Sequence, residues 1–203
     1  MARLRGPNKD LQSRLRGLGL DFRLEWTHAG AEEEANGADF FVELDIDFKG
    51  FCTRKAILVQ SKRLMSIRGP GAGDSDNDEY SAYEQAQANR MLNLTSSSYY
   101  LLYNPEAVRA SSSDHESGLT WVAASTMVTF SKPPKFRDVV GHQVGFADFL
   151  MDAFIQTIVG DPRLTVDSKG RVHVERPHRD DDFRVERVLR LRMANADGKH
   201  PNS

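Results

Sequence analysis

Residues 38–63 (ADFFVELDIDFKGFCTRKAILVQSKR) constrain the fold of this chain most strongly, because they have the pattern of two β-strands and a short connection. In residues 40–48 the apolar side chains fall on one face and the acidic ones on the other, which is the period of two of a half-buried strand. Gly50 interrupts this pattern, and residues 56–62 resume it with aliphatic side chains that give way to polar ones. The stretch therefore predicts an antiparallel hairpin.

Three polar residues mark the two strand ends that this hairpin would bring together. Asp39 precedes the first strand, and Gln60 and Lys62 end the second, where alternation places them on one face. Carboxylate and amide oxygens are hard ligands that suit Mg²⁺, and Mg²⁺ can lower the pKa of a bound water and offset charge on a phosphate. A lysine beside them can hold the phosphate or help to deprotonate the attacking water. This arrangement favours metal-assisted phosphodiester chemistry.

The two motifs resemble those of the PD-(D/E)xK nuclease superfamily, and within it the Mrr-like branch in which Gln replaces the second acidic residue. The tripeptide that ends in Asp39 (Gly-Ala-Asp) matches the first motif of that branch, and residues 60–62 (Gln-Ser-Lys) match its second motif. The resemblance covers residues 20–105. It implies an α/β fold with a restriction-endonuclease-like core, in which a mixed central sheet in αβββαβ order is flanked by helices.

The resemblance also implies roles for individual residues. Glu34, five residues before Asp39, matches the glutamate that related nucleases place upstream, although Glu32 and Glu33 compete for that role. The expected catalytic residues are Glu34, Asp39, Gln60 and Lys62. The expected ligands of Mg²⁺, for which Mn²⁺ can substitute, are Asp39, Gln60 and Glu34. The expected contacts to nucleic acid come from Lys62, Arg63 and Arg68.

We therefore expect a metal-dependent nuclease that hydrolyses phosphodiester bonds, most readily in DNA, with a role in restriction or anti-phage defence. A homodimer or a partner subunit would supply specificity, since the sequence has no recognisable target-recognition domain. A homodimer also suits the reaction, because cutting both strands of a duplex is simplest with two sites. Two alternatives stay open. The fold can be a catalytically inactive module that binds nucleic acid or protein, since Gln60 has one negative charge fewer than an acid. Alternatively, Asp39 and Lys62 form an ordinary ion pair that contributes little to stability.

Composition narrows the class of protein further. With 203 residues, 39% hydrophobic and 28% charged, the chain is long enough to bury a core without disulfides. Its net charge of −2 argues against a polycation along the whole chain, but not against local basic patches. Cys52 is the single cysteine, which excludes an internal disulfide and favours a reducing compartment. No apolar run has the length of a membrane helix or the place of a signal region, so we expect a cytoplasmic protein without membrane contact.

The remaining segments are expected to surround the hairpin. We expect a nuclease domain over residues 1–160, a C-terminal extension packed on it over residues 161–193, and a disordered tail over residues 194–203. Further strands are predicted over residues 20–28, residues 98–103 and the two arms of a hairpin in residues 164–174. Helices are predicted over residues 8–18, 79–94 and 145–159. The patterns of residues 119–130 and 183–193 fit a strand or a helix.

Polar and aromatic side chains in these segments have a structural and a functional interpretation. Gln85, Gln87 and Asn89 of the helix over residues 79–94 are interpreted as exposed polar positions rather than catalytic ones. The tyrosines of residues 98–103 can stack on bases, but a tyrosine in a strand is more often part of the core. A modest phosphate-facing patch is offered by arginines of the C-terminal segment: Arg184, Arg187, Arg190 and Arg192.

Overall fold

The structure is a computed structural model. It describes residues 20–28, 37–48, 50–65, 79–104, 118–156, 159–167, 171–175, 181–184 and 187–195. The predicted helix over residues 8–18 and the candidate residues Glu32, Glu33, Glu34 and Arg68 lie outside the described residues.

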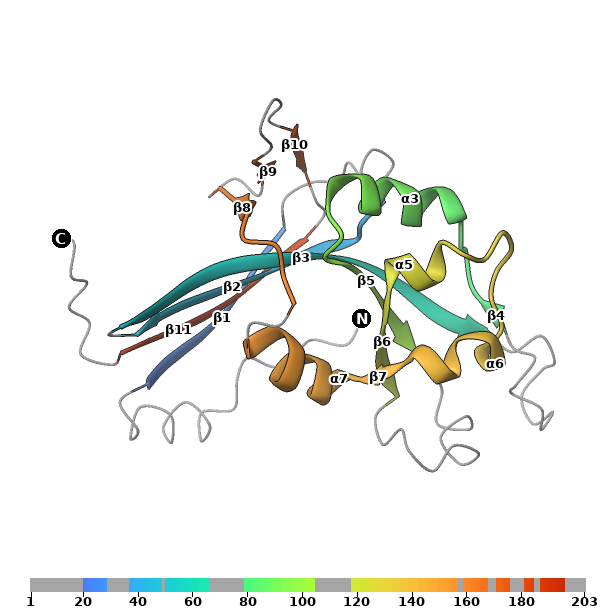
Figure 1. The fold of residues 1–203 in the computed structure, drawn as a ribbon, viewed down its shortest axis with the longest axis horizontal. Helices are drawn as coiled ribbons and strands as arrows, with labels where there is room; N and C mark the ends of the chain where they lie inside the picture. Colours follow the sequence, from blue (N-terminus) through green and yellow to red (C-terminus); the bar gives the residue numbers. More distant parts are fainter. Residues whose placement is uncertain are drawn as a thin grey trace.

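A mixed sheet forms the centre of the molecule, and strands far apart in the sequence lie side by side in it (Figure 1). In order across the sheet, the strands are β1 (Leu20–His28), β11 (Arg187–Asn195), β2 (Phe40–Phe48), β3 (Phe51–Met65), β5 (Ser98–Tyr103), β6 (Leu119–Ala123) and β7 (Val144–Gly145). The short strand β4 (Glu79–Tyr80) pairs with the end of β3. The pairs β11–β2 and β3–β5 are parallel, and the other neighbours are antiparallel. The predicted α/β class and mixed central sheet are thus confirmed.

The strands β2 and β3 form the antiparallel hairpin that the alternation predicts. Phe40 pairs with Val59, so the next residues outward along the two strands, Asp39 and Gln60, face each other. The second strand is longer than predicted, since β3 begins directly after the turn at Gly50. The register of the hairpin therefore fixes the two motifs at one end of the sheet.

The prediction of a half-buried first strand is wrong for the middle of β2, which is buried on both faces. Glu43, on the face predicted to be solvated, is 0% exposed. Its carboxylate accepts a hydrogen bond from Nε of Arg54 at 2.6 Å and forms an ion pair with Arg190 of β11. A buried carboxylate is tolerated when cations and hydrogen bonds replace its water. The alternating pattern thus predicts the strand β2 correctly, but it does not predict that both of its faces are buried.

The two faces of the central sheet are covered by different elements (Figure 1). One face, called the α3 face, carries Lys62 and Tyr100 and lies under α3 (Gln85–Leu94) and α5 (Ala124–Met127). The opposite face, called the η3 face, carries Val59 and Leu101 and packs against α7 (Phe146–Asp148) and the π-helical segment η3 (Phe149–Ile155). Full burial of one such large apolar side chain stabilises the fold by about 1.5–3 kcal/mol.

A second, three-stranded antiparallel sheet covers another part of the α3 face. Its order is β10 (Asp181–Arg184), β9 (Arg171–Val174) and β8 (Leu164–Val166). Buried apolar residues from all three strands, among them Leu164, Val172 and Phe183, share one core cluster with Phe41 and Leu58 of the hairpin. The predicted hairpin in residues 164–174 is confirmed as β8 and β9. Arg190, the ion-pair partner of Glu43, donates to the backbone oxygen of Val166 in β8, so the small sheet adjoins the buried carboxylate.

The helices are shorter than predicted. The helix predicted over residues 79–94 begins at Gln85, because the backbone before it is used elsewhere: Tyr80 donates to Pro134 and Ser81 donates to Arg63. Residues 119–130 contain both alternatives, since strand β6 leads directly into α5. The remaining short helical turns are α6 (Phe136–Val139) and η2 (Val140–His142).

The helix predicted over residues 145–159 is confirmed for α7 and η3, but its winding changes along its length. The i→i+5 bonding of η3 winds the backbone more widely than an α-helix does, and Phe149 and Phe154 are both buried in the same cluster. Trp121 of β6 stacks on Phe146 and Phe149, with ring centroids 5.7 and 4.7 Å apart. This aromatic contact holds the helix against the sheet.

The last described strand, β11, lies between β1 and β2 in the central sheet. It pairs with β1 over residues 187–195 and with β2 over residues 187–194. This strand comes from the segment that the sequence analysis assigns to the C-terminal extension and the start of the tail. The central sheet is therefore completed by both ends of the described chain, while the proposed domain division stays a prediction.

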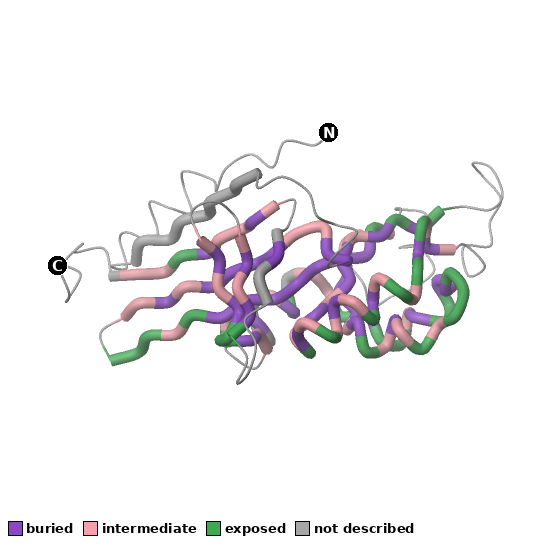
Figure 2. The backbone as a smooth tube through the Cα atoms, turned by 90° about the horizontal axis from the view of Figure 1, so that it is seen from above, coloured by how far each residue is buried: buried purple, intermediate pink, exposed green. Residues whose placement is uncertain are grey.

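Burial is concentrated where the two sheets and the helices overlap, and the strand ends become exposed (Figure 2). The turn between β2 and β3 is exposed, and Phe51 beside it is 48% exposed. Within the described residues, no helix has the length and apolar character needed to span a membrane.

Candidate active site

A close packing contact fixes the entrance of β2 against α3. Gly37 has a φ of +76°, which residues other than glycine rarely adopt. A Cβ atom added to Gly37 would lie 2.7 Å from the backbone oxygen of Gln87. The glycine of the Gly-Ala-Asp motif therefore has a steric role, since it lets the residues before Asp39 approach α3.

Asp39 is partly exposed and accepts hydrogen bonds from two consecutive residues of β3. Its Oδ1 accepts from Nε2 of Gln60 at 2.9 Å. Its Oδ2 accepts from the backbone nitrogen of Ser61 at 2.7 Å and also from the Ser61 hydroxyl. The structure thus brings Asp39 and Gln60 together, as the register of the predicted hairpin requires.

The amide of Gln60 is buried but only half satisfied. The residue is 2% exposed, and its Oε1 has no hydrogen-bond partner among the described residues. Buried polar atoms nearly always have a partner, because an unmade hydrogen bond costs about 1–3 kcal/mol. An acceptor left open beside a carboxylate indicates a position where a ligand, rather than the protein, completes the bonding.

The donor set of Asp39 and Gln60 fits a magnesium ion. Both supply hard oxygen atoms, and Mg²⁺ binds few protein groups and keeps several waters. Among the described residues, no group of three or more His, Cys, Asp and Glu side chains is placed to hold a metal. Glu34, the third expected ligand, lies outside the described residues. The described chain therefore offers two of the three expected ligands.

Lys62 lies on the α3 face and is held by the start of α3. The residue is 6% exposed, and its Nζ donates to the backbone oxygen of Ala82 at 2.7 Å and to Oε1 of Gln87 at 2.8 Å. Ala82 has a φ of +49°, an unusual conformation for a residue with a side chain. These two oxygens fix the position of the ammonium group in a site from which most water is excluded.

Sequence reasoning missed the partners of the two motifs. Gln87 was interpreted as an exposed polar residue, but it bonds Lys62, and Gln85 donates to the backbone oxygen of Val128; both residues are half-buried. Ser61, the middle residue of the second motif, bonds Asp39 twice. Helical periodicity alone does not identify Gln87, because its partner Lys62 lies on a strand. The close contact between Gly37 and Gln87 is the feature that indicates that Gln87 lies at the site.

Arg63, an expected contact to nucleic acid, lies on the η3 face and is exposed. Within the described part of the chain its guanidinium makes no hydrogen bond or ion pair. Its register neighbour on β5 is Tyr103, which is 44% exposed, whereas Tyr100 is 0% exposed. The tyrosines of β5 thus divide: Tyr100 belongs to the core, and Tyr103 is available to a partner.

The predicted phosphate-facing patch of C-terminal arginines is not available as a whole. Arg190 forms an ion pair with Glu43, and its side chain is 16% exposed. Arg192 lies 3.3 Å from Asp45 of the neighbouring strand β2. The parallel pairing of β11 and β2 places each arginine beside its register neighbour, and these ion pairs join the two strands.

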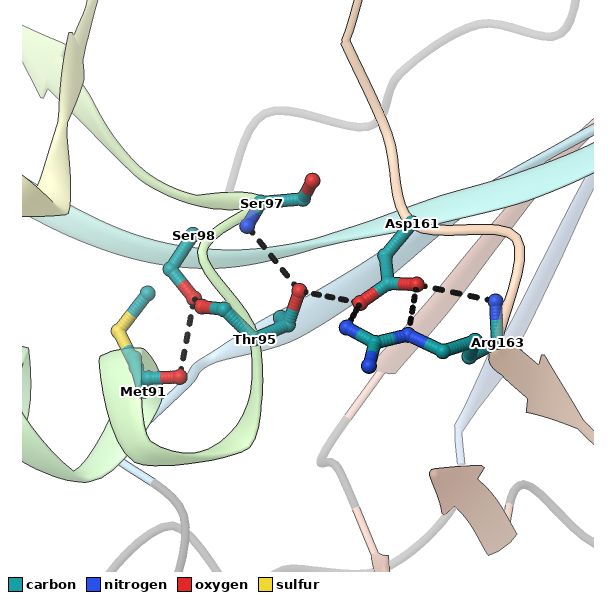
Figure 3. A network of polar contacts seen from close by, with 6 residues as sticks. All are labelled: Met91, Thr95, Ser97, Ser98, Asp161 and Arg163. Carbon is teal, nitrogen blue, oxygen red and sulfur yellow. Dashed lines mark hydrogen bonds and ion pairs between the residues drawn. The ribbon is translucent and has the colours of Figure 1, made fainter. Parts of the chain in front are cut away.

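A second network of polar contacts surrounds the carboxylate of Asp161, shortly before the chain enters β8 (Figure 3). Asp161 is 5% exposed, and it accepts hydrogen bonds from Thr95 at 2.7 Å and from Arg163 at 2.8, 3.0 and 3.0 Å. Its backbone pairs with Ala56 of β3. Burial raises the pKa of Asp161, but the hydrogen bonds from Arg163 and Thr95 outweigh it and hold that pKa below its usual value. This cluster clamps the small sheet to β3 and to the end of α3.

Lys55 is a buried cation beside this clamp. It is 4% exposed, donates to the backbone oxygen of Val159, and lies 5.0 Å from the ring centroid of Phe154. Gly160, with a φ of +114°, leaves room for its stem, since a Cβ there would lie 2.7 Å from Cδ of Lys55. Burial lowers the pKa of Lys55 to about 8.

Comparison with known proteins returned no family model, no curated protein and no solved structure that matches this chain.

Proposed function

We propose that this protein is a Mg²⁺-dependent nuclease of the PD-(D/E)xK type, with Asp39, Gln60 and Lys62 at its active site. The observation that carries the proposal is the buried Oε1 of Gln60, which has no partner in the described part of the chain and lies beside the carboxylate of Asp39. An oxygen acceptor in that position is explained by a cation that it helps to bind.

In this proposal each residue has a separate role. Asp39 and Gln60 would hold the metal, and Glu34 would complete or orient its ligands. When bound, the metal lowers the pKa of an attacking water and offsets the charge that develops on the phosphate. Lys62, which Gln87 and Ala82 keep in place, would hold the scissile phosphate or take part in deprotonating the water.

The order of elements supports the restriction-endonuclease-like core. Three long strands (β1, β2 and β3) are followed by a helix (α3) and a strand (β5) that is parallel to β3. This is the βββαβ part of the expected αβββαβ order, with the short β4 inserted. The arrangement departs from a simple meander, because β11 lies between β1 and β2. We infer that this strand is an addition to the core and leaves the β2–β3 motifs in place.

The preferred substrate in this proposal is DNA, and the role is restriction of foreign DNA or defence against phage. The formal charge of −2 on the whole chain means that contacts to the backbone must be local. Arg63 is a described candidate for such a contact. A second copy of the chain or a partner subunit would be needed to cut both strands of a duplex together.

One observation favours the second candidate, a catalytically inactive binding module. Lys62 is 6% exposed, and its ammonium already donates to Ala82 and Gln87. A lysine that only stabilises the start of α3 would have the same two contacts. In that case Asp39 and Gln60 would serve structure, and the protein would bind nucleic acid or protein without cutting.

A cleavage assay separates the two candidates. Purified protein is incubated with supercoiled plasmid, linear duplex, single-stranded DNA and RNA, in Mg²⁺, Mn²⁺ or EDTA. Lys62→Ala is run beside it, with Lys132→Ala as a matched control that removes an exposed lysine. We expect metal-dependent cleavage that Lys62→Ala lowers at least ~1000-fold, which corresponds to about 4 kcal/mol, and that Lys132→Ala leaves unchanged.

Circular dichroism and thermal melting establish that each variant is folded. Undiminished cleavage by folded Lys62→Ala would remove Lys62 from the site. Absence of cleavage by wild-type protein that also fails to bind metal would leave the binding module as the better function.

A further inference from the structure

Four buried side-chain atoms in the described part of the chain have no hydrogen-bond partner: Gln60 Oε1, Tyr100 OH, Arg90 Nε and Trp121 Nε1. Trp121 lies on the η3 face, where it packs against Phe149. The other three belong to the α3 face and to the helix above it. Unpaired buried polar atoms are rare in native proteins, so a group of three needs a common explanation.

Tyr100 is the register neighbour of Gln60. The parallel pairing of β3 and β5 sets these two residues side by side, and alternation puts both side chains on the α3 face. Tyr100 is 0% exposed and its ring centroid lies 6.2 Å from that of Tyr83. Burial, with smaller contributions from Tyr83 and Asp39, raises the pKa of Tyr100, so the hydroxyl keeps its proton at neutral pH.

Arg90 reaches the same place from α3. It lies three residues after Gln87, so the two share a face of the helix. Gln87 of the helix bonds Lys62, and the backbone oxygen of Met91 accepts from Ser98, the register neighbour of Leu58, so Arg90 lies between these contacts at the level of Gln60 and Tyr100. The charge of Arg90 lowers the pKa of the Tyr100 hydroxyl, whereas that of Asp39 raises it. Within the described residues its guanidinium makes no ion pair, and the residue is partly exposed. Its Nε atom is nevertheless buried without a partner among the described residues, and a bound anion would supply the missing acceptor.

We infer that Arg90 and Tyr100 form a phosphate-binding subsite next to Asp39 and Gln60. The chemistry of the open atoms supports this assignment: Tyr100 OH and Arg90 Nε are hydrogen-bond donors, whereas Gln60 Oε1 is an acceptor. Donors bind the oxygens of a phosphate, and acceptors bind the cation that neutralises it. Neither Arg90 nor Tyr100 belongs to the two motifs of the sequence, so the subsite extends the proposed nuclease site, on which this inference rests.

The subsite would select a class of ligand rather than a base sequence. A guanidinium and a hydroxyl recognise phosphate oxygens in either a phosphodiester or a free phosphate ion, and neither group reads a base. The subsite would therefore bind DNA and RNA backbones through the same contacts. It would set the position of one phosphate group relative to Asp39, and the choice of sequence would come from elsewhere.

Conservative substitutions test the subsite without metal. Tyr100→Phe removes only the hydroxyl, and Arg90→Met removes the charge and keeps most of the stem. Tyr99→Phe is the matched control, because it makes the same change one residue away on the η3 face. Binding of a fluorescein-labelled 20-nucleotide DNA strand is measured by anisotropy in EDTA, at several salt concentrations, and binding of inorganic phosphate is measured by calorimetry.

We expect Arg90→Met to weaken DNA binding about 10–100-fold and to reduce the salt-dependence slope by about one, as the loss of one phosphate contact requires. Tyr100→Phe should weaken binding about 3–10-fold without lowering the melting temperature, since its hydroxyl has no partner to lose. Arg90→Lys should restore part of the affinity, and Tyr99→Phe should have no effect. Phosphate binding that follows the same order identifies the subsite itself as the place of binding.

Other results overturn the inference. If Tyr100→Phe lowers the melting temperature and leaves binding intact, the hydroxyl bonds an internal water and has no ligand. If cleavage is metal-dependent but both variants bind and cut as the wild type does, the nuclease proposal stands and the subsite fails. If no nucleic acid is cut but phosphate and DNA binding still depend on Arg90 and Tyr100, the subsite stands and the nuclease proposal fails.

Discussion

The carboxylates of Asp161 and Asp39 both lie beside the strand β3, but the hydrogen bonding of their neighbours differs. Asp161 is bonded on both oxygens by Thr95 and Arg163, and no atom of these three residues is among the buried unpartnered atoms of the described residues. Asp39 is also bonded on both oxygens, but its neighbour Gln60 keeps an open acceptor. A satisfied cluster adds to stability and has nothing left to offer a ligand. A cluster with an unpaired polar atom lowers the stability of the fold, and such a cluster is typical of a site where a bound ligand supplies the missing contact.

The same comparison separates two buried lysines on β3. Lys55 lies on the η3 face beside the Asp161 clamp, and Lys62 lies on the α3 face near Asp39. Lys55 contacts an aromatic ring and a backbone oxygen on the face opposite to Gln60. Lys62 contacts a side-chain amide next to the candidate metal ligands. Both lysines are buried, and what distinguishes Lys62 as the candidate catalytic lysine is its position near the open acceptor of Gln60.

The largest expected effect in the comparison is on stability, from the same substitution at both carboxylates. Asp161→Asn places an amide nitrogen against donors and removes the charge that pairs with Arg163, so we expect a loss of about 2–3 kcal/mol in unfolding free energy. Asp39→Asn should cost less than about 0.5 kcal/mol, because its new N–H group can bond the open Oε1 of Gln60 after that amide rotates. Urea unfolding followed by circular dichroism measures both values. Equal losses at the two positions would end the distinction between them.

Metal binding should give the next largest effect. Mg²⁺ at ten times its dissociation constant should raise the unfolding free energy of the wild type by about 1.4 kcal/mol through mass action. Asp39→Asn should abolish this increase, and Asp161→Asn should retain it in full, measured from its own lower baseline. Thermal melting over a Mg²⁺ titration reports the change, with Na⁺ at matched ionic strength as the control. Stabilisation that survives Asp39→Asn would place the metal elsewhere.

The smallest effect concerns pH and belongs to the structural side of the comparison. Burial lowers the pKa of Lys55 from 10.5 to about 8, so between these values the unfolded chain binds more protons than the folded one. Stability should therefore rise with pH through that window, by about 1 kcal/mol from pH 8 to pH 9. Lys55→Met should remove this contribution, which is read as the difference between the two pH profiles of urea unfolding. Parallel profiles for the two proteins would contradict the assignment.

The sequence predicted the hairpin and its register because a period of two is a local property. Residues 40–48 and the strand that follows alternate strongly enough to fix which side chains share a face. Once the two strands pair, Asp39 has to face Gln60, and no information from the rest of the chain is needed. The strand β1 is predicted for the same reason, whereas β5 is predicted from a compact apolar run and the β8–β9 hairpin from the turn residues between its arms.

The burial of Glu43, the bonding of Lys62 to Gln87 and the clamp at Asp161 were not predicted. Each depends on a partner far away in the sequence: Arg190 is 147 residues from Glu43, and Thr95 is 66 residues from Asp161. The pattern of residues 40–48 indicates an acidic face exposed to water, and only the small sheet packed above it changes that environment. Arg90 has no motif around it, and the tyrosines of residues 98–103 favour a place in the core, so the sequence gives no sign that Arg90 and Tyr100 lie together.

The sequence by itself thus determined the strands β1, β2, β3 and β5, the hairpin register and the pairing of Asp39 with Gln60, and it left residues 119–130 and 183–193 open between strand and helix. The tertiary structure decided the rest: which strand lies between β1 and β2, which carboxylate is satisfied, and which acceptor stays open. Periodicity encodes the direction of a side chain from its own element, since backbone geometry repeats locally. Whether that side chain finds a partner depends on which apolar faces meet when the chain closes, and this is settled only by packing over long sequence distances.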